Sequence, residues 1–342
     1  MNRLYLRLDA ASFLGYGHMY QCLALAEVCR TDFSIIFLVK DHEPGVAEQI
    51  RLAGYPVLNV PHAMDEEQEV EFILSNVPRE GTAGILIDHH YLSEDYSRRL
   101  KQGGYWLAQI DDEGKRGFCC DLLINYNIYA DEIPYSTGTH TVKLLGPQYA
   151  ILRWEFGGLP DTAKNSARLL VTMGGGYARG EVVKILAALE LIAPDILERI
   201  DPVIIVGSGY PGSGELVRAC ADKPFTVIVS PSGMARHMMG AGFAVSGAGG
   251  TLYELARCRV PAITITLDHN QEQIADGFAA RGLSVSLGWY ESVTPEAIAA
   301  AITRWADQDE VREDYRRRVT GLIDGKGTER IAMEIKRQCL VA

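Results

Sequence analysis

Residues 8–30 of the chain are LDAASFLGYGHMYQCLALAEVCR. An apolar strand over residues 4–8 leads into a turn bounded by Gly15 and Gly17, and His18 and a helical run follow at once. Glycines let the backbone approach a ligand closely, and the N–H groups of a helix N-terminus attract anions. The imidazole of His18 exchanges protons near neutral pH. This stretch therefore predicts a βα unit that acts on a phosphorylated substrate.

The same alternation of strand and helix continues along the chain. Predicted strands span residues 3–8, 33–39, 56–59, 84–88, 105–110, 121–124, 168–173, 202–206, 225–229, 242–246, 261–266 and 283–286. Predicted helices span residues 18–30, 44–53, 65–76, 93–102, 179–193, 214–221, 250–257, 271–281, 295–306 and 308–322. Such alternation indicates βαβ units and hence an α/β protein with parallel sheets.

The strand series occurs twice, and 342 residues are more than one hydrophobic core usually serves. Between the two series, residues 155–167 are polar and rich in Gly, Pro and small side chains. We therefore predict two Rossmann-like, doubly wound parallel-sheet domains facing a central cleft, one over residues 1–157 and one over 166–327. The last helix, within 328–342, is expected to return to the first domain.

The composition excludes several classes of protein. A formal charge of −11 argues against non-specific nucleic-acid binding. The N-terminus lacks the features of a signal peptide, and no apolar run approaches the ~18 residues of a membrane span. The seven cysteines are odd in number and form no C-x-x-C pair, so reduced thiols are expected. These features favour a cytoplasmic protein without membrane insertion.

A glycine-rich turn follows the predicted strand 242–246. Gly249, Gly250 and Thr251 open the next helix, where unpaired N–H groups suit a diphosphate. Glu254 lies one turn further on and is placed to accept hydrogen bonds from a ribose diol. The alternative is a plain βα turn whose glycines only permit tight packing, and the local sequence does not separate the two interpretations.

Other predicted strands also end in residues suited to a ligand, because open α/β sheets bind ligands beyond the carboxyl ends of their strands. Gly174 and Gly175 follow one of them. Asn270 and Gln271 follow another, and their amides suit sugar hydroxyl or acetamido groups. The alternative for this second segment is an N-cap, with Asn270 accepting from the next helix.

Acidic groups end two strands of the first half. Asp88 closes one of these strands, and Tyr91 follows it after two histidines. The adjacent histidines point in different directions and no carboxylate completes a metal-ligand spacing, so no metal is predicted there. Residues 111–113 (Asp-Asp-Glu) follow the next strand, either as a divalent-ion site or as a structural strand end.

His18 also has two interpretations, a catalytic group or a histidine that packs or caps near a turn. Asp9 ends the preceding strand and is placed to orient the imidazole or the turn, which favours a general base. A G-x-S-x-G nucleophile elbow, a Walker A lysine and a zinc signature are all absent from the sequence, and the G-x-G turn is too short for a dinucleotide fingerprint. Hydride transfer and ATP hydrolysis are therefore poor fits.

Taken in order, these motifs resemble a known family. It comprises the hydrolases of UDP-2,4-diacetamido-2,4,6-trideoxy-β-L-altropyranose in the pseudaminic acid pathway and the related spore-coat polysaccharide biosynthesis proteins. The resemblance spans roughly residues 4–330. Its motifs are Asp9–Ser12, Leu14–His18, Ile87–Tyr91, Ile110–Glu113, Cys120–Asn125, Leu145–Arg153, Met173–Gly175, Ser246–Glu254 and Asn270–Gln271.

The resemblance implies a two-domain glycosyltransferase-B (GT-B) fold and the release of UDP by water attack at the anomeric carbon. The family's histidine after the glycine turn acts on that water, and His18 stands at its position. The implied UDP contacts are Gly249, Gly250, Thr251 and Glu254, and the implied sugar contacts are Asp88, Tyr91, Asn270 and Gln271. UDP leaves readily once backbone N–H groups hold its charge, so neither a metal nor a cofactor is expected.

Two positions depart from the family pattern. Gln21 stands where the family commonly has Arg, and no Asp follows the glycines at 174–176. These departures favour a nucleotide sugar different from that of the named hydrolases.

Three functions remain from the sequence. The leading hypothesis is hydrolysis of a UDP-linked deoxy-amino sugar, with His18 as general base and Asp9 beside it. The second is a GT-B glycosyltransferase, in which an acceptor hydroxyl replaces water. The third is a non-catalytic protein that only binds a nucleotide sugar.

Overall fold

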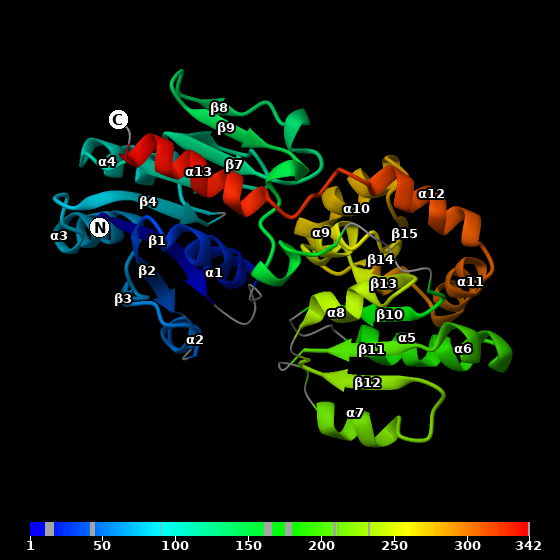
Figure 1. The fold of residues 1–342 in the computed structure, drawn as a ribbon. Helices are drawn as coiled ribbons and strands as arrows, with labels where there is room; N and C mark the ends of the chain where they lie inside the picture. The colour runs from blue at the N-terminus through cyan, green and yellow to red at the C-terminus, as the bar shows by residue number, and fades with distance from the viewer. Residues whose placement is uncertain are drawn as a thin grey trace. The chain divides into compact units, whose positions relative to one another are not determined.

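The computed structural model of the chain describes residues 1–10, 17–41, 45–89, 91–160, 166–174, 180–207, 210, 212–231 and 233–340. The chain forms two compact units, which we call unit 1 and unit 2 (Figure 1). Unit 1 contains Met1–Trp154 and Lys326–Ala342, and unit 2 contains Glu155–Gly325. The chain therefore passes from unit 1 into unit 2 and back again.

Unit 1 is built on a parallel sheet with the strand order β3-β2-β1-β4-β5-β7-β9. Its strands are β1 (Arg3–Ala10), β2 (Ser34–Asp41), β3 (Val57–Asn59), β4 (Thr82–Asp88), β5 (Leu107–Ile110), β7 (Leu122–Asn125) and β9 (Val142–Leu145). A short separate pair joins β6 (Gly117–Phe118) to β8 (Ser136–Thr137). The central strands are continuous apolar runs, such as residues 85–87 of β4, because helices bury both faces of the sheet.

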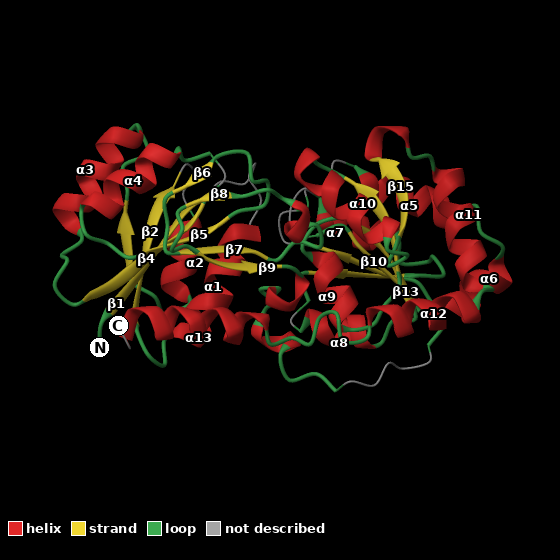
Figure 2. Cartoon of the chain, turned by 90° about the horizontal axis from the view of Figure 1, so that it is seen from above, coloured by secondary structure: helices red, strands yellow, loops and turns green. Residues whose placement is uncertain are grey.

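Helices cover the two faces of this sheet (Figure 2). One face packs against α1 (Gly17–Cys29), α2 (Val46–Leu52) and α13 (Gly327–Leu340), and the other against α3 (Glu66–Asn76) and α4 (Glu94–Gln102). The sequence fixes two of these helix starts. Asp65 and Gln68 form a capping box at α3, and the hydroxyl of Ser93 accepts from the N–H of Tyr96 at α4.

The last helix, α13, belongs to unit 1. Its residues Ile331 and Ile335 are fully buried in the core that α1 also lines. Arg330 donates to the carbonyl of Gln148, and Lys336 pairs with Asp32 at 2.5 Å. Residues from the far end of the chain therefore complete the core of the unit that begins it.

Unit 2 repeats the parallel-sheet plan with the order β12-β11-β10-β13-β14-β15. The strands are β10 (Leu169–Thr172), β11 (Val203–Val206), β12 (Thr226–Val229), β13 (Phe243–Gly247), β14 (Ala262–Thr266) and β15 (Val285–Trp289). The helices are α5 (Glu181–Glu190), α6 (Pro194–Ile200), α7 (Ser213–Ala219), α8 (Met234–Met239), α9 (Thr251–Arg257), α10 (Glu272–Ala280), α11 (Pro295–Ala306) and α12 (Asp309–Val319). Helices α5, α6 and α11 pack on one face of this sheet, and α8, α9 and α12 lie on the other (Figure 2).

In both sheets the direction in which the chain adds strands reverses at one point. In unit 1 the chain winds outward from β1 to β2 on one side and continues through β4 on the other. In unit 2 the same reversal separates β10 from β13. Ligands of doubly wound sheets bind beyond the carboxyl ends of the strands at such switch points. A ligand is therefore expected beyond the carboxyl ends of β1 and β4 and of β10 and β13.

The α/β prediction with two parallel sheets is confirmed, but it missed the strands β6, β8 and β9 and the helices α6 and α8. Strand β9 was not predicted, since only Leu144 of its four residues is buried and its apolar pattern is weak. Helix α6 was also missed, because Pro194 follows the preceding helix and was not recognised as an N1 residue. The predicted helix 308–322 is shorter in the structure and ends at Val319.

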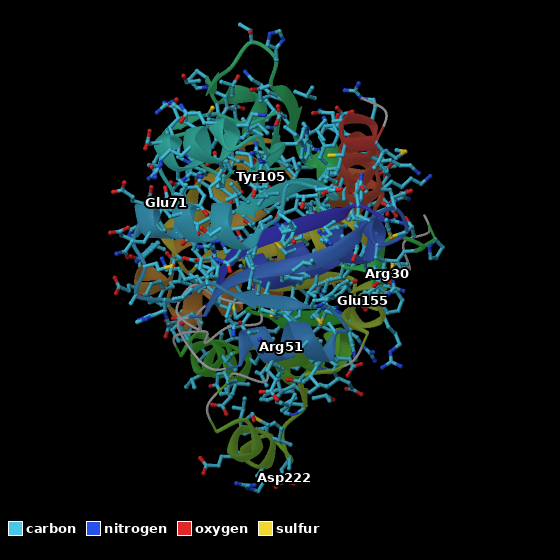
Figure 3. All side chains as sticks on the ribbon, turned by 90° about the vertical axis from the view of Figure 1, so that its left-hand side faces the viewer. Arg30, Arg51, Glu71, Tyr105, Glu155 and Asp222 are labelled. Atoms are coloured by element: carbon cyan, nitrogen blue, oxygen red, sulfur yellow. The ribbon has the colours of Figure 1, made fainter. Side chains whose placement is uncertain are left out.

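Tyr105 lies inside unit 1, whereas Glu71 and Arg51 lie at its surface (Figure 3). The hydroxyl of Tyr105 donates to the carbonyl of Val77, so this buried phenol has its hydrogen bond. No helix in the described parts of the chain combines the length and the apolarity needed to cross a bilayer.

Candidate active site

His18 pairs with Asp88 at the switch point of unit 1. His18 lies in the first turn of α1, and Asp88 is the last residue of β4. His18 Nδ1 is 2.9 Å from Asp88 Oδ1. The Asp88 side chain is fully buried and the His18 side chain is 20% exposed. A buried carboxylate at Nδ1 fixes the ring orientation and leaves proton exchange to Nε2, as in other Asp–His pairs.

The surrounding charges determine the protonation of His18. Burial acts to lower the pKa of the imidazole, but the carboxylate of Asp88, with further contributions from Asp112 and Asp9, raises it to about 9. At pH 7 only about one His18 in a hundred is then neutral in the free protein. The resting pair is an imidazolium beside a carboxylate.

The second oxygen of Asp88 is held by α1. Gln21 Nε2 donates to Asp88 Oδ2 at 2.9 Å, and the Cys22 thiol donates to the same oxygen at 3.5 Å. The hydroxyl of Tyr126, just after β7, donates to Gln21 Oε1 at 2.6 Å. Burial and the negative charge of Asp88 raise the pKa of the Cys22 thiol well above its ordinary value, so the thiol is not a nucleophile here.

Asp9 lies at the end of β1, but its hydrogen bonds lead to Arg7 and His89. Arg7 Nη1 is 2.5 Å from Asp9 Oδ1, and His89 Nε2 is 2.6 Å from Asp9 Oδ2. His89 Nδ1 accepts from the backbone N–H groups of Tyr91 and Leu92, which places the ring proton on Nε2. His89 thus orders the start of the loop that presents Tyr91, whose side chain is exposed and meets the His89 ring edge-on.

A buried ionic network supports Asp9 from within unit 1. Arg7 and Glu69 are both fully buried and share two hydrogen bonds, at 2.5 and 3.0 Å. Tyr96 and Lys40 also donate to Glu69. Burial acts to raise the pKa of Glu69, but the hydrogen bonds and charge of Arg7 lower it below its ordinary value. The network keeps Arg7 charged and aimed at Asp9.

The carboxylates after β5 are tied into the loops of unit 1. Asp111 Oδ2 accepts from the N–H groups of Glu113 and Gly114 and from the hydroxyl of Tyr135. Asp112 accepts from the amide of Asn127 at 2.7 Å. This favours the structural interpretation of residues 111–113. Among the described residues, no group of three or more His, Cys, Asp and Glu side chains is arranged to hold a metal ion.

In unit 2 the turn after β13 leads directly into α9. Gly250 precedes the helix with φ −53°, a value that any residue adopts, and an added Cβ would meet nothing within 4 Å. Neither backbone strain nor crowding by the described residues therefore requires glycine at this position. Gly250 is exposed, and a glycine allows close approach to the backbone at the start of α9. Thr251 and Glu254 follow in the first turn of α9, both partly exposed.

The side chain of Gln271 stabilises this turn by hydrogen bonds. Its Oε1 accepts from the N–H of Ala248 at 3.2 Å and from the N–H of Leu267 at 3.0 Å, and its Nε2 lies beside Gly249. The capping role considered for Asn270 belongs instead to Asp268, whose carboxylate accepts from the N–H of His269. The reason is that the segment first forms a 3-10 turn, which moves the cap two residues earlier.

The remaining predicted residues are placed as follows. Gly17 is exposed at the start of α1, Asn270 is exposed after β14, and Gly174 follows β10 with φ +88°, a conformation that requires glycine. Gly15 and Gly175 lie outside the described residues. The structure brings together Asp9, His18 and Asp88 in unit 1, and Gly249, Gly250, Thr251 and Gln271 in unit 2.

Sequence reasoning missed the contacts made by Gln21, Tyr126 and His89. A signal was available for two of them, because Tyr126 and His89 each follow directly on a strand of the same parallel sheet. The lateral order of the strands was needed to see that these ends are neighbours.

Two curated proteins are similar to this chain in sequence. The chain is 28% identical over 326 residues to the spore coat polysaccharide biosynthesis protein SpsG of Bacillus subtilis, covering 93% of each protein. It is also 28% identical over 154 residues to the UDP-2,4-diacetamido-2,4,6-trideoxy-β-L-altropyranose hydrolase of Campylobacter jejuni, covering 44% of this chain and 52% of that protein. The chain is homologous to these proteins. The resemblance to their family is thus confirmed, although no family model matches the chain.

Solved structures that are similar to the chain establish its fold. MurG of Acinetobacter baumannii superimposes with a TM-score of 0.71, covering 98% of this chain and 99% of MurG at 13% identity. UGT89C1 of Arabidopsis thaliana, solved with UDP-L-rhamnose, gives a TM-score of 0.64 over 99% of each chain at 12% identity. The chain therefore has the GT-B fold, with one parallel-sheet domain in each unit.

Proposed function

We propose that the chain is a nucleotide-sugar enzyme of polysaccharide biosynthesis that hydrolyses a UDP-linked 2,4-diacetamido-2,4,6-trideoxy hexose. In this proposal His18 removes a proton from water, the water oxygen forms the new bond to the anomeric carbon, and the bond from that carbon to the UDP oxygen breaks. The products are the free sugar and UDP. The observation that carries the proposal is the His18–Asp88 pair at the switch point of unit 1.

The pair has the properties that a general base needs. Asp88 holds Nδ1, so Nε2 is the nitrogen that accepts the proton, and the new charge on the ring forms beside a buried carboxylate. The raised pKa of His18 makes the neutral ring a stronger base than free imidazole, at the cost of a small neutral fraction at pH 7. Activity should accordingly increase with pH.

Unit 2 is assigned to the nucleotide. The glycine at 250 is not required by the backbone or by packing, which supports close approach of a diphosphate to residues 249–251. Glu254 is proposed to bind the ribose hydroxyls, and Asn270 and the Nε2 group of Gln271 to bind the sugar. The curated relatives support a nucleotide-sugar substrate, one through its place in polysaccharide biosynthesis and one through its UDP-sugar substrate.

A glycosyltransferase is the second candidate, and the fold favours it. The structures that superimpose on the chain include glycosyltransferases. The same His18–Asp88 pair would then activate a hydroxyl group of an acceptor in place of water. The two reactions differ only in the nucleophile.

The deciding experiment follows UDP release from a panel of UDP-sugars, with and without candidate acceptors, in H₂¹⁸O. The hydrolase predicts release without acceptor and one ¹⁸O atom at C1 of the free sugar. Label in UDP instead would mean attack at phosphorus and would exclude the mechanism. Release that requires an acceptor would favour the transferase.

The parallel experiment on His18→Ala tests the catalytic role. UDP release should fall by at least about 10²-fold while UDP still binds. His140→Ala, an exposed histidine of unit 1, is the matched control and should keep full activity. If the parent protein binds UDP-sugars without releasing UDP under any condition, it is a binding protein and not an enzyme.

A further inference from the structure

The strongest feature that the proposed mechanism does not use is the side chain of Gln21. Its amide has a fixed orientation, because the hydroxyl of Tyr126 donates to Oε1 and so turns Nε2 toward Asp88. The three side chains come from separate parts of unit 1: the end of β4, the first turns of α1 and the segment after β7. Gln21 therefore links Asp88, at the end of β4, to Tyr126, which follows β7.

The second relevant property of Gln21 is that it carries no charge. Asp88 receives hydrogen bonds from an amide and a thiol, which hold its Oδ2 atom without neutralising it. An arginine at position 21 would place a positive charge at hydrogen-bond distance from the same carboxylate. This charge would partly neutralise Asp88, so the carboxylate would stabilise the imidazolium of His18 less.

We propose that Gln21 is a positioning residue for His18: its amide fixes the Asp88 carboxylate, and its neutrality preserves the negative charge that holds a proton on His18. The proposal has two separable parts, one geometric and one electrostatic. The proposal rests on the proposed function, but its electrostatic part is tested on the protein without substrate.

Two carboxylates besides Asp88 act on His18. Asp112, after β5, and Asp9, at the end of β1, both favour the imidazolium. Asp9 is itself paired with Arg7 and with His89. Substitution at position 21 leaves these groups in place, so a change in the titration of His18 comes from the side chain at position 21.

The test follows the ring protons of His18 by NMR between pH 5 and 10.5 in the full chain. The signal of His18 among the eight histidines is identified by its absence in His18→Ala. Gln21→Arg should lower the pKa of His18 by one unit or more, a tenfold or greater change in its acid dissociation constant. Gln21→Lys, as a second cation, should lower it in the same direction.

Two control variants separate charge from geometry. Gln49→Arg makes the same exchange at an exposed position of α2 and should leave the pKa of His18 unchanged. Gln21→Met removes both hydrogen bonds without adding charge. It should change the pKa of His18 by less than about half a unit but lower kcat, because the Asp88 carboxylate loses its fixed orientation.

An unchanged His18 titration in both Gln21→Arg and Gln21→Lys would overturn the electrostatic part. A shift in Gln21→Met as large as that in Gln21→Arg would also overturn it, since charge would not be the cause. Full kcat in Gln21→Met would overturn the geometric part. Failure of the proposed function shows separately, as unaltered UDP release in His18→Ala, and does not affect the NMR result.

Discussion

The properties of His18 follow from its partners more than from its own position. The pair with Asp88 joins a residue of α1 to a residue 70 positions later in the chain, because β1 and β4 are hydrogen-bonded neighbours with Leu8 opposite Asp88. The sequence predicted that Asp9, His18 and Asp88 lie near strand ends. It assigned the orienting carboxylate to Asp9, whereas the hydrogen bond at Nδ1 comes from Asp88, because strand ends are readable from sequence and their lateral order is not.

The first prediction concerns pH. As a general base His18 must be neutral, and its pKa is raised to about 9, so kcat/KM for UDP release should rise about tenfold per pH unit up to pH 9 and then level off. Initial rates at low substrate concentration between pH 6 and 10 measure this profile. A flat profile between pH 6.5 and 8.5 would contradict the general-base role.

Asp88→Asn gives the second prediction. The loss of the carboxylate should lower the pKa of His18 toward its ordinary value, so the plateau of kcat/KM begins at a lower pH. The plateau itself should lie at least about 10²-fold below that of the parent, because the ring loses its orienting partner. Reduced activity with an unmoved profile would show that Asp88 does not control the protonation of His18.

At the scale of the elements, the strands buried on both faces were the most predictable part of the chain. β4 and β13 contain the apolar runs 85–87 and 243–245 between glycine or polar residues, and both strands fall where the sequence predicted them. The edge strand β9 and the short helix α6 were missed, since neither has a strong period or a polar boundary on both sides. Packing against neighbours decides such elements, and packing is not visible in a local window.

The buried pair of Arg7 in β1 and Glu69 in α3 gives the third prediction. Removing one partner leaves an uncompensated charge in the interior, so Glu69→Ala should lower the free energy of unfolding by about 3–5 kcal/mol. Thermal or urea unfolding followed by circular dichroism measures the loss. Glu71→Ala, on the exposed side of α3, is the matched control and should cost under about 1 kcal/mol.

The helix α13 gives the fourth prediction. Ile335→Ala should lower the free energy of unfolding by about 2–5 kcal/mol, because the side chain is fully buried in the core of unit 1. Met333→Ala, two residues earlier and 63% exposed, should change it by less than about 0.5 kcal/mol. Equal effects in the two variants would show that α13 does not pack as described.

At the scale of the whole molecule, the proposed function divides its tasks between the two units. The nucleotide is assigned to residues of unit 2 and the reacting proton to His18 of unit 1. The GT-B fold and the similarity to SpsG were both anticipated from the order of the motifs. The motifs do not single out one sugar among UDP-linked deoxy-amino sugars, because loop sequences carry no periodic signal.

The fifth prediction tests this division by calorimetry with UDP. Glu254→Ala should weaken UDP binding at least about tenfold, the loss expected for a hydrogen-bonded ribose contact. His18→Ala should bind UDP within about twofold of the parent, since UDP lacks the sugar. Weaker UDP binding in His18→Ala than in Glu254→Ala would show that the nucleotide does not bind to unit 2 as proposed.

The return of α13 to unit 1 has a consequence for how the polypeptide is made. Unit 2 is one uninterrupted segment and is complete once residue 325 has left the ribosome, but unit 1 still lacks Ile331 and Ile335 at that moment. The nascent chain can close the core around the proposed proton acceptor only after Ile331 and Ile335 have been made. A polypeptide that stops before α13 would therefore contain a complete unit 2 attached to an unfinished unit 1.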